Sequence, residues 1–328
     1  MRDVAEVAGV SFKTVSRVIN DEAGVADATA ARVRDAIQSL GFRRNDTARS
    51  LRPGQASTML GLIVADITNP FYSGIAHGAE SVARKRGYTL TLANSDEDPD
   101  RERDLIEMLW MRRIDGLLLV SACDDHSYLE PELSAGTKII FVDRPPSNIQ
   151  ADVVLLDNIT GARQGVEYLL SQGHRHIGMV GDNPERFYTT RERLAGFEAA
   201  HQAAGLQVDP SLLRLNSHDA IQAETAADEL LSLPDSPTAV FTTNNRNSLG
   251  VLRALHRHQA RVAVAGFDDF ELADLLAVPI TVVAHDPAEM GRHAAEQLFR
   301  RIDGADTPPQ RITLPTRLVI RGPQLTAG

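Results

Sequence analysis

From residue 58 onward, short apolar runs alternate with amphipathic stretches of helical periodicity, and the whole series occurs twice. The runs of the first series cover residues 60–65, 88–93, 117–120 and 139–142, and those of the second cover residues 177–181, 212–215, 239–243 and 262–266. Short continuous apolar runs separated by helices are typical of buried parallel strands. The two series therefore predict an α/β body of two lobes, each built on a doubly wound parallel sheet.

The N-terminal segment has a different pattern, with three short stripes of helical periodicity. Their apolar positions are Val4, Val7 and Ala8, then Val15, Val18 and Ile19, and finally Ala30, Val33, Ile37 and Leu40. Gly9 permits a sharp turn after the first stripe, and Ser11 can cap the second helix. Two short helices joined by a tight turn that contains glycine have helix-turn-helix geometry. The sequence predicts an all-α helix-turn-helix head.

The second predicted helix exposes a face made mostly of hydrogen-bonding side chains. These residues are Phe12, Lys13, Thr14, Ser16, Arg17 and Asn20. A recognition helix presents such groups to base edges and phosphates in the major groove of DNA. The alternative is an ordinary solvated face, which explains an exposed Phe12 least well. Charge favours DNA, because residues 1–54 carry nine Lys/Arg and seven Asp/Glu whereas the whole chain has a net charge of −10.

The segment of residues 3–20, DVAEVAGVSFKTVSRVIN, and the later segment of residues 48–52, ARSLR, resemble the head and hinge of the lactose-repressor (LacI/GalR) family of transcriptional regulators. By that resemblance, Phe12, Lys13 and Arg17 read bases, while the phosphate contacts are Thr14, Ser16 and Asn20. The resemblance also implies a hinge helix that pairs with its dimer mate in the minor groove, with Leu51 as a wedge in the central base step. The DNA-binding positions of this hinge are Asn45, Ala48, Arg49, Leu51 and Arg52.

Residues 45–51 contain too few apolar side chains for a stable lone helix, so a disordered linker is the alternative in the free protein. We expect a head at residues 1–44, a hinge and linker at 45–57, and a body for effector binding and dimerisation at 58–328. By the resemblance, the body has the type I periplasmic-binding-protein architecture. Its N-lobe would hold residues 58–155 and 286–314, and its C-lobe residues 156–285 and 315–328. Three crossings between lobes would make a hinge.

Polar and aromatic side chains follow the predicted strands, where ligands bind in doubly wound sheets. Amides and carboxylates that converge with an arginine and an aromatic ring suit a polyol. The resemblance assigns several of these residues to inducer contact, and the alternative for each is a loop cap or turn. The candidate effector-binding residues are Asn69, Phe71, Tyr72, Asp143, Arg193, His218, Asn244, Asp268 and His285. Asn245 departs from the family, which usually has Asp there.

Other function classes find little support in the sequence. No P-loop, GxSxG or HExxH motif occurs, and no GxGxxG follows a predicted strand. The His174/His176 and His256/His258 pairs lack the further ligands that a metal needs. We expect no catalytic residue, no cofactor and no metal. A single cysteine, Cys123, an acidic N-terminus and the absence of an apolar span predict a cytoplasmic protein without membrane insertion.

These features together predict a homodimeric DNA-binding transcriptional regulator of the repressor kind. Two heads on a two-fold axis would read a pseudo-palindromic operator in double-stranded DNA. A sugar or nucleoside-like small molecule in the cleft between the lobes would control operator affinity. Two alternatives remain open: the same fold controlled by a protein partner, and a cytosolic small-molecule binding protein without DNA function.

Overall fold

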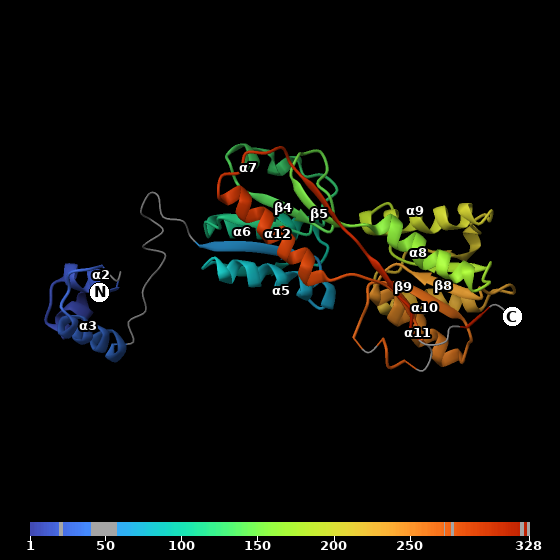
Figure 1. Ribbon diagram of the computed structural model, residues 1–328, viewed down its shortest axis with the longest axis horizontal. Helices are drawn as coiled ribbons and strands as arrows, with labels where there is room; N and C mark the ends of the chain where they lie inside the picture. Colours follow the sequence, from blue (N-terminus) through green and yellow to red (C-terminus); the bar gives the residue numbers. More distant parts are fainter. Residues whose placement is uncertain (20–21, 41–57, 272, 277–278, 322–324, 327–328) are drawn as a thin grey trace. The chain divides into compact units, whose positions relative to one another are not determined.

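The computed structural model describes residues 1–19, 22–40, 58–271, 273–276, 279–321 and 325–326. The chain divides into two compact units, Met1–Ser57 and Thr58–Gly328, and each is described by itself (Figure 1). Six candidate DNA-binding residues lie outside the described residues, namely Asn20, Asn45, Ala48, Arg49, Leu51 and Arg52. No described helix is long and apolar enough to span a membrane.

The head contains the three predicted helices, α1 (Arg2–Ala8), α2 (Phe12–Ile19) and α3 (Asp27–Ser39). Gly9, with φ 61°, ends α1 in the left-handed conformation, and the Thr14 amide donates to the Ser11 hydroxyl oxygen at 3.1 Å at the start of α2. The small core is built from the buried residues Val4, Ala8, Val15, Val18, Ala30, Val33 and Ala36. This confirms the helix-turn-helix prediction.

Two positions assigned to the helical stripes of the head do not belong to its core. Val7 is 58% exposed and Leu40 is 45% exposed. Val7 lies beside the row of Val4 and Ala8, which faces the core at the i, i+4 spacing of a short helix. Leu40 follows the last turn of α3 as its C-cap. The stripes were therefore predicted too wide at these two ends.

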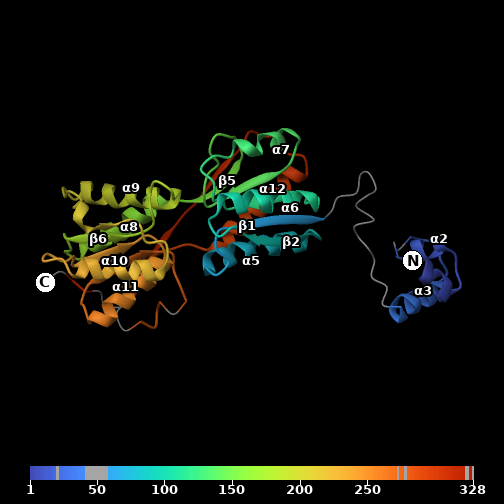
Figure 2. The same cartoon turned by 180° about the vertical axis from the view of Figure 1, so that it is seen from behind.

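The N-lobe is a parallel sheet with helices on both faces. Its strands are β1 (Met59–Val64), β2 (Thr89–Asn94), β3 (Gly116–Leu119), β4 (Ile139–Val142), β5 (Asp152–Leu156) and β11 (Arg311–Leu314), in the order β11-β5-β4-β3-β1-β2. Helices α5 (Pro70–Lys85) and α12 (Pro287–Ile302) pack on one face. Helix α6 (Pro99–Met111), with the turn Ser127–Leu129 and α7 (Glu130–Ser134), covers the other (Figures 1 and 2).

The C-lobe repeats this plan. Its strands are β6 (Ile177–Val180), β7 (Leu213–Arg214), β8 (Ala239–Thr242), β9 (Ala263–Phe267), β10 (Thr281–Ala284) and β12 (Arg317–Val319), in the order β12-β10-β9-β8-β6-β7. Among the described strands of this lobe, only β12 runs antiparallel to its neighbour, β10. Helices α8 (Asn158–Ser171) and α9 (Tyr188–Ala203) pack on one face, and α10 (Ala220–Leu231) and α11 (Asn245–His258) on the other. The two sheets confirm the predicted fold class.

The chain passes between the two sheets three times (Figure 1). It leaves the N-lobe after β5, returns between β10 and α12, and leaves again between β11 and β12. Because β5, β10, β11 and β12 lie outside the two predicted series of strands, both sheets are wider than the apolar runs indicated. The crossings place the strand ends of both lobes around one cleft.

Candidate functional site

A cavity of about 70 Å³ lies between the two lobes. Its lining residues are Asp66, Asn69, Phe71, Tyr72, Glu97, Asp143, Arg144, Asp182, Phe187, Thr189, Arg193, His218, Asn244, Arg246 and Asp268. Every candidate effector-binding residue except His285 is among them. His285 lies directly behind this lining, because its Nε2 is 2.8 Å from Oδ1 of Asp268. The fold therefore brings together residues that are more than 200 positions apart.

Arg193, on the first turns of α9, is the central cation of the C-lobe wall. Its Nε donates to Oδ1 of Asn158 at 2.8 Å, and its Nη1 donates to the carbonyl oxygen of Thr243. Nη1 also lies 3.4 Å from Oδ2 of Asp268. The guanidinium stacks 3.7 Å from the centre of the Phe267 ring. Because contacts surround it on several sides, the buried side chain presents its donors in one orientation.

Asp143 and Asp268 occupy equivalent positions in the two lobes, directly after β4 and β9. Both have left-handed backbone, with φ 68° and 66°, a conformation that is rare outside glycine and often marks functional sites. Burial acts to raise the pKa of Asp268, but Arg193 and His285 outweigh it and the pKa is lowered. Burial dominates at Asp143 and raises its pKa, although Arg144 opposes it.

Oδ1 of Asp143 is buried and has no hydrogen-bond partner. A buried acceptor without a donor carries a free-energy penalty of about 1–3 kcal/mol. A ligand hydroxyl in this cavity would supply the missing donor. Asp143 is thus a position where a hydrogen bond from a bound polyol would remove such a penalty.

Aromatic rings and a histidine form the rest of the wall. Phe71 and Tyr72 pack edge to face with ring centres 4.9 Å apart. His218 stacks on Phe187 at 5.3 Å, and its Nδ1 lies 2.8 Å from Oδ1 of Asp182. This hydrogen bond raises the pKa of His218. The rings offer apolar faces beside the carboxylates, which suits a sugar ring with one hydrophobic face.

Direct hydrogen bonds join the lobes at the start of α11. Nδ2 of Asn245 donates to Oδ1 of Asn69 at 2.9 Å, and Arg246 donates to Thr68 at 2.6 Å and to Asp66. The departure from the family at Asn245 has a physical consequence here. An amide can donate across the cleft to Asn69, whereas a carboxylate could not.

Several lining residues were absent from the sequence-based set, most importantly Glu97, Arg144, Asp182, Phe187 and Arg246. Asp182 directly follows the predicted 177–181 strand, so the rule that located Asp143 would have found it. Arg144 also follows a strand end, and it pairs with Glu97 at 2.6 Å to each carboxylate oxygen. Glu97, Phe187 and Arg246 also follow predicted strands by three to six residues, as Phe71 and His218 do, so the same rule could have included them.

The head presents the second candidate surface. Phe12 is 54% exposed and Lys13 is also exposed, while Thr14, Ser16 and Arg17 are half-buried on the same helix. Nη2 of Arg17 donates to the carbonyl oxygen of Ala23. The buried residues of α2, Val15 and Val18, point into the core, so the polar face is available to a nucleic acid.

No group of three or more His, Cys, Asp or Glu side chains in the described part of the chain is arranged to hold a metal ion. The His174 ring forms hydrogen bonds instead, from Nδ1 to the hydroxyl of Thr238 at 2.9 Å and from Nε2 to the carbonyl oxygen of Leu325 at 3.0 Å. His258 binds Asp228 at 2.9 Å. These two histidines therefore have structural hydrogen bonds.

Both units of the chain match known protein families. The pattern of the lacI family of bacterial regulatory proteins matches residues 1–45, and that of the periplasmic binding protein-like domain matches residues 166–322. The ribose operon repressor of Escherichia coli K12 is 34% identical over an alignment of 329 positions, which covers 98% of each chain. The PurR repressor of Aliivibrio fischeri MJ11 is 32% identical over 315 residues, covering 93% of this chain and 92% of that protein.

Two solved structures of regulators are similar to nearly the whole chain. The complex of the transcriptional regulator CelR with cellobiose has a TM-score of 0.73 at 32% identity and covers 97% of this chain and 98% of its own. The lac repressor dimer bound to operator and the anti-inducer ONPF has a TM-score of 0.83 at 26% identity, with 97% of both chains covered. These relatives are regulators rather than enzymes. The chain belongs to the LacI family of bacterial regulatory proteins.

Proposed function

We propose that this protein is a cytoplasmic transcriptional repressor whose operator affinity is controlled by a sugar or nucleoside-like effector in the cleft between the lobes. The observation that carries the proposal is the cavity in which Arg193, Asp143 and Asp268 converge from two lobes, in a chain that also has a helix-turn-helix head. Two relatives are named for what they regulate or bind, a ribose operon repressor and a regulator in complex with cellobiose.

In the cleft, Arg193 would donate to ligand hydroxyls while Asp143 and Asp268 accept from them. This division suits a vicinal diol, because each hydroxyl both donates and accepts. We assign the other contacts to the remaining candidate residues, Asn69, Phe71, Tyr72, His218, Asn244 and His285. The lobes would close further or open on the effector as rigid bodies and so alter the spacing of the two heads.

On DNA, two copies of the chain would place their heads in successive half-sites of a pseudo-palindrome. Support comes from the solved lac repressor, which is a dimer on its operator. We assign base readout to Phe12, Lys13 and Arg17 and phosphate contacts to Thr14, Ser16 and Asn20. The hinge contacts proposed from the sequence, Asn45, Ala48, Arg49, Leu51 and Arg52, complete the surface.

We expect specific operator binding to weaken steeply with salt. Each head and hinge would contribute four cationic side chains, Lys13, Arg17, Arg49 and Arg52, so a dimer would contribute eight. Because these side chains displace counterions from the DNA, affinity should fall by about 10³- to 10⁵-fold between roughly 50 and 200 mM salt. Fluorescence anisotropy with an operator selected from a random DNA library measures this slope. Lys13→Ala should make the slope shallower, whereas Lys85→Ala, an exposed lysine of the body, should leave it unchanged. A salt-independent affinity would contradict the proposal.

Replacing Arg17 by alanine should cost about 1–3 kcal/mol of operator binding and relax the preference at one base pair in each half-site. The reason is that an arginine in the major groove commonly forms two hydrogen bonds to guanine. Binding to an operator library, compared with binding to random DNA, measures both effects. An equal loss on both kinds of DNA would make Arg17 a phosphate contact instead.

A further inference from the structure

A second and larger cavity, of about 360 Å³, adjoins the cavity described above. We call the first the inner cavity and the second the outer cavity. Both are lined by Glu97, Arg144 and Phe187, so these three side chains form the partition between them. Beyond the partition, the outer cavity reaches Ala122 in the N-lobe and Arg191 in the C-lobe. The two spaces therefore form one continuous cleft divided by side chains.

The ion pair of Arg144 with Glu97 is the main part of the partition. The two side chains are only 12% and 10% exposed, and two hydrogen bonds of 2.6 Å join them. Arg144 also donates to the carbonyl oxygen of Ser121 at 2.9 Å, yet its Nε is buried without a partner. An unused donor at the boundary between two cavities is available to a ligand that passes from one to the other.

The inner cavity alone is too small for a sugar ring. An engineered cavity of about 150 Å³ in another protein accommodates benzene, a ring without hydroxyl groups. The inner cavity has less than half of that volume, and the outer cavity has more than twice that volume. A sugar held by Asp143, Arg193 and Asp268 would therefore extend past the partition.

The chemistry of the outer cavity favours a neutral ring. Its three arginines, at 144, 186 and 191, are matched by three carboxylates, at 97, 124 and 185. A phosphate would meet as much negative as positive charge there. The Phe187 and Tyr188 rings offer apolar faces on the C-lobe side. A second sugar ring or a nucleobase could pack against such faces.

We propose that the effector is a neutral glycoside of two rings, with its sugar ring held by Asp143, Arg193 and Asp268 and reaching the partition, and with its second ring in the outer cavity. The link between the rings passes the Arg144–Glu97 pair, where Nε of Arg144 donates to it. This inference rests on the proposed role of the cleft as the effector site. Disaccharides and nucleosides share this two-ring chemistry, and the test below separates them.

The test measures binding of the full-length protein to matched ligands by isothermal titration calorimetry. The probes are ribose and glucose, the disaccharides cellobiose, maltose and lactose, and the nucleosides adenosine and cytidine. We expect one two-ring compound to bind at least about 10-fold more tightly than its component monosaccharide, which corresponds to about 1.4 kcal/mol. The same compound should change operator affinity.

Two variants test the outer cavity directly. Ala122→Phe would fill it, and we expect binding of the two-ring compound to weaken at least about 10-fold while monosaccharide binding is unchanged. Ala135→Phe, at an exposed position after α7, is the matched control. It should change neither the binding of the two-ring compound nor that of the monosaccharide. Arg191→Ala, an exposed side chain of the outer cavity, serves if Ala122→Phe does not fold, and should weaken the two-ring compound alone.

The possible results separate the two ideas. The two-ring proposal is overturned if a monosaccharide binds as tightly as every glycoside and controls operator affinity in Ala122→Phe as it does in the wild type. The proposed function would remain intact in that case. If no probe of either class binds or changes operator affinity, the effector proposal itself fails and this inference fails with it. Tight binding by nucleosides alone, or by disaccharides alone, identifies the second ring.

Discussion

The Arg193→Met variant should lose about 3–5 kcal/mol of its free energy of unfolding and all response to effector. Methionine keeps most of the length and apolar contact with the Phe267 ring but removes the charge. Asp268, which is buried, would then lose the cation that lies 3.4 Å away. Breaking a buried pair by removing one partner costs this much because the other charge remains desolvated. Urea unfolding measures the stability, and operator binding with and without effector measures the response.

A double variant separates the two roles of Arg193. Arg193→Met combined with Asp268→Asn removes the buried negative charge that has lost its arginine and keeps only its contact with His285, so it should recover part of the lost stability and none of the effector response. Asp268→Asn alone keeps the side-chain shape, and we expect it to bind operator and to ignore effector. An Arg193→Met protein as stable as the wild type would show that the buried pair does not stabilise the fold. A full effector response in Asp268→Asn would remove Asp268 from the site.

Gly78→Ala should destabilise the N-lobe by about 1–3 kcal/mol or more, by forcing apart two helices. Gly78 lies in α5 where α12 crosses it, and a β-carbon there would overlap the carbonyl oxygen of Ala288. The crossing is reciprocal, because a β-carbon at Gly291 of α12 would overlap the carbonyl oxygen of Ile75. The obstacle in each case is backbone, which cannot swing aside as a side chain can.

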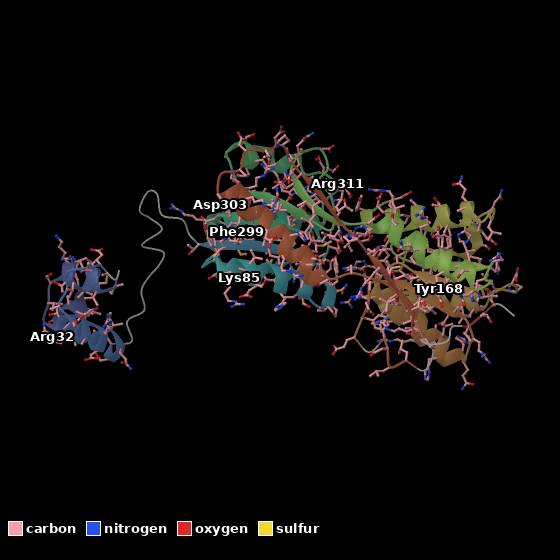
Figure 3. All side chains as sticks on the ribbon, viewed as in Figure 1. Arg32, Lys85, Tyr168, Phe299, Asp303 and Arg311 are labelled. Carbon is pink, nitrogen blue, oxygen red and sulfur yellow. The ribbon has the colours of Figure 1, made fainter. Side chains whose placement is uncertain are left out.

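The contacts at the far end of the same helix pair resist separation. Figure 3 shows Phe299 and Asp303 toward the end of α12 and Lys85 at the end of α5. Oδ2 of Asp303 accepts a hydrogen bond from Nη1 of Arg86 at 2.8 Å. The rings of Phe299 and Tyr88 pack edge to face with their centres 4.9 Å apart.

His77→Ala is the control for Gly78→Ala, since His77 is the exposed preceding residue of the same helix. Both variants are compared by urea unfolding. Wild-type stability in Gly78→Ala would mean that the helices lie further apart.

Local patterns were sufficient to predict most of the secondary structure. Apolar residues at helical spacing located α1, α2 and α3, and each of the eight predicted apolar runs overlaps a strand. The strands next to the crossings, β5, β10, β11 and β12, were not predicted. For example, β11 is Arg311–Leu314 with mostly exposed or half-buried side chains, so it lacks a continuous apolar run. Asp143, Asn244 and Asp268 were placed correctly at strand ends because a parallel sheet directs those ends to one edge.

Local sequence patterns were therefore sufficient for the two-part organisation, the helix-turn-helix head and the βα repeat, because each depends on residues that are neighbours in the chain. Which side chains come into contact depends on the tertiary structure. Glu97 forms an ion pair with Arg144, which is 47 positions away in the sequence, and Asn245 donates to Asn69, which is 176 positions away. Position 78 must be glycine because α12, more than 200 residues later, packs directly against it. Such contacts depend on how the lobes and helices pack, and periodicity carries no information about distances between residues so far apart in the sequence.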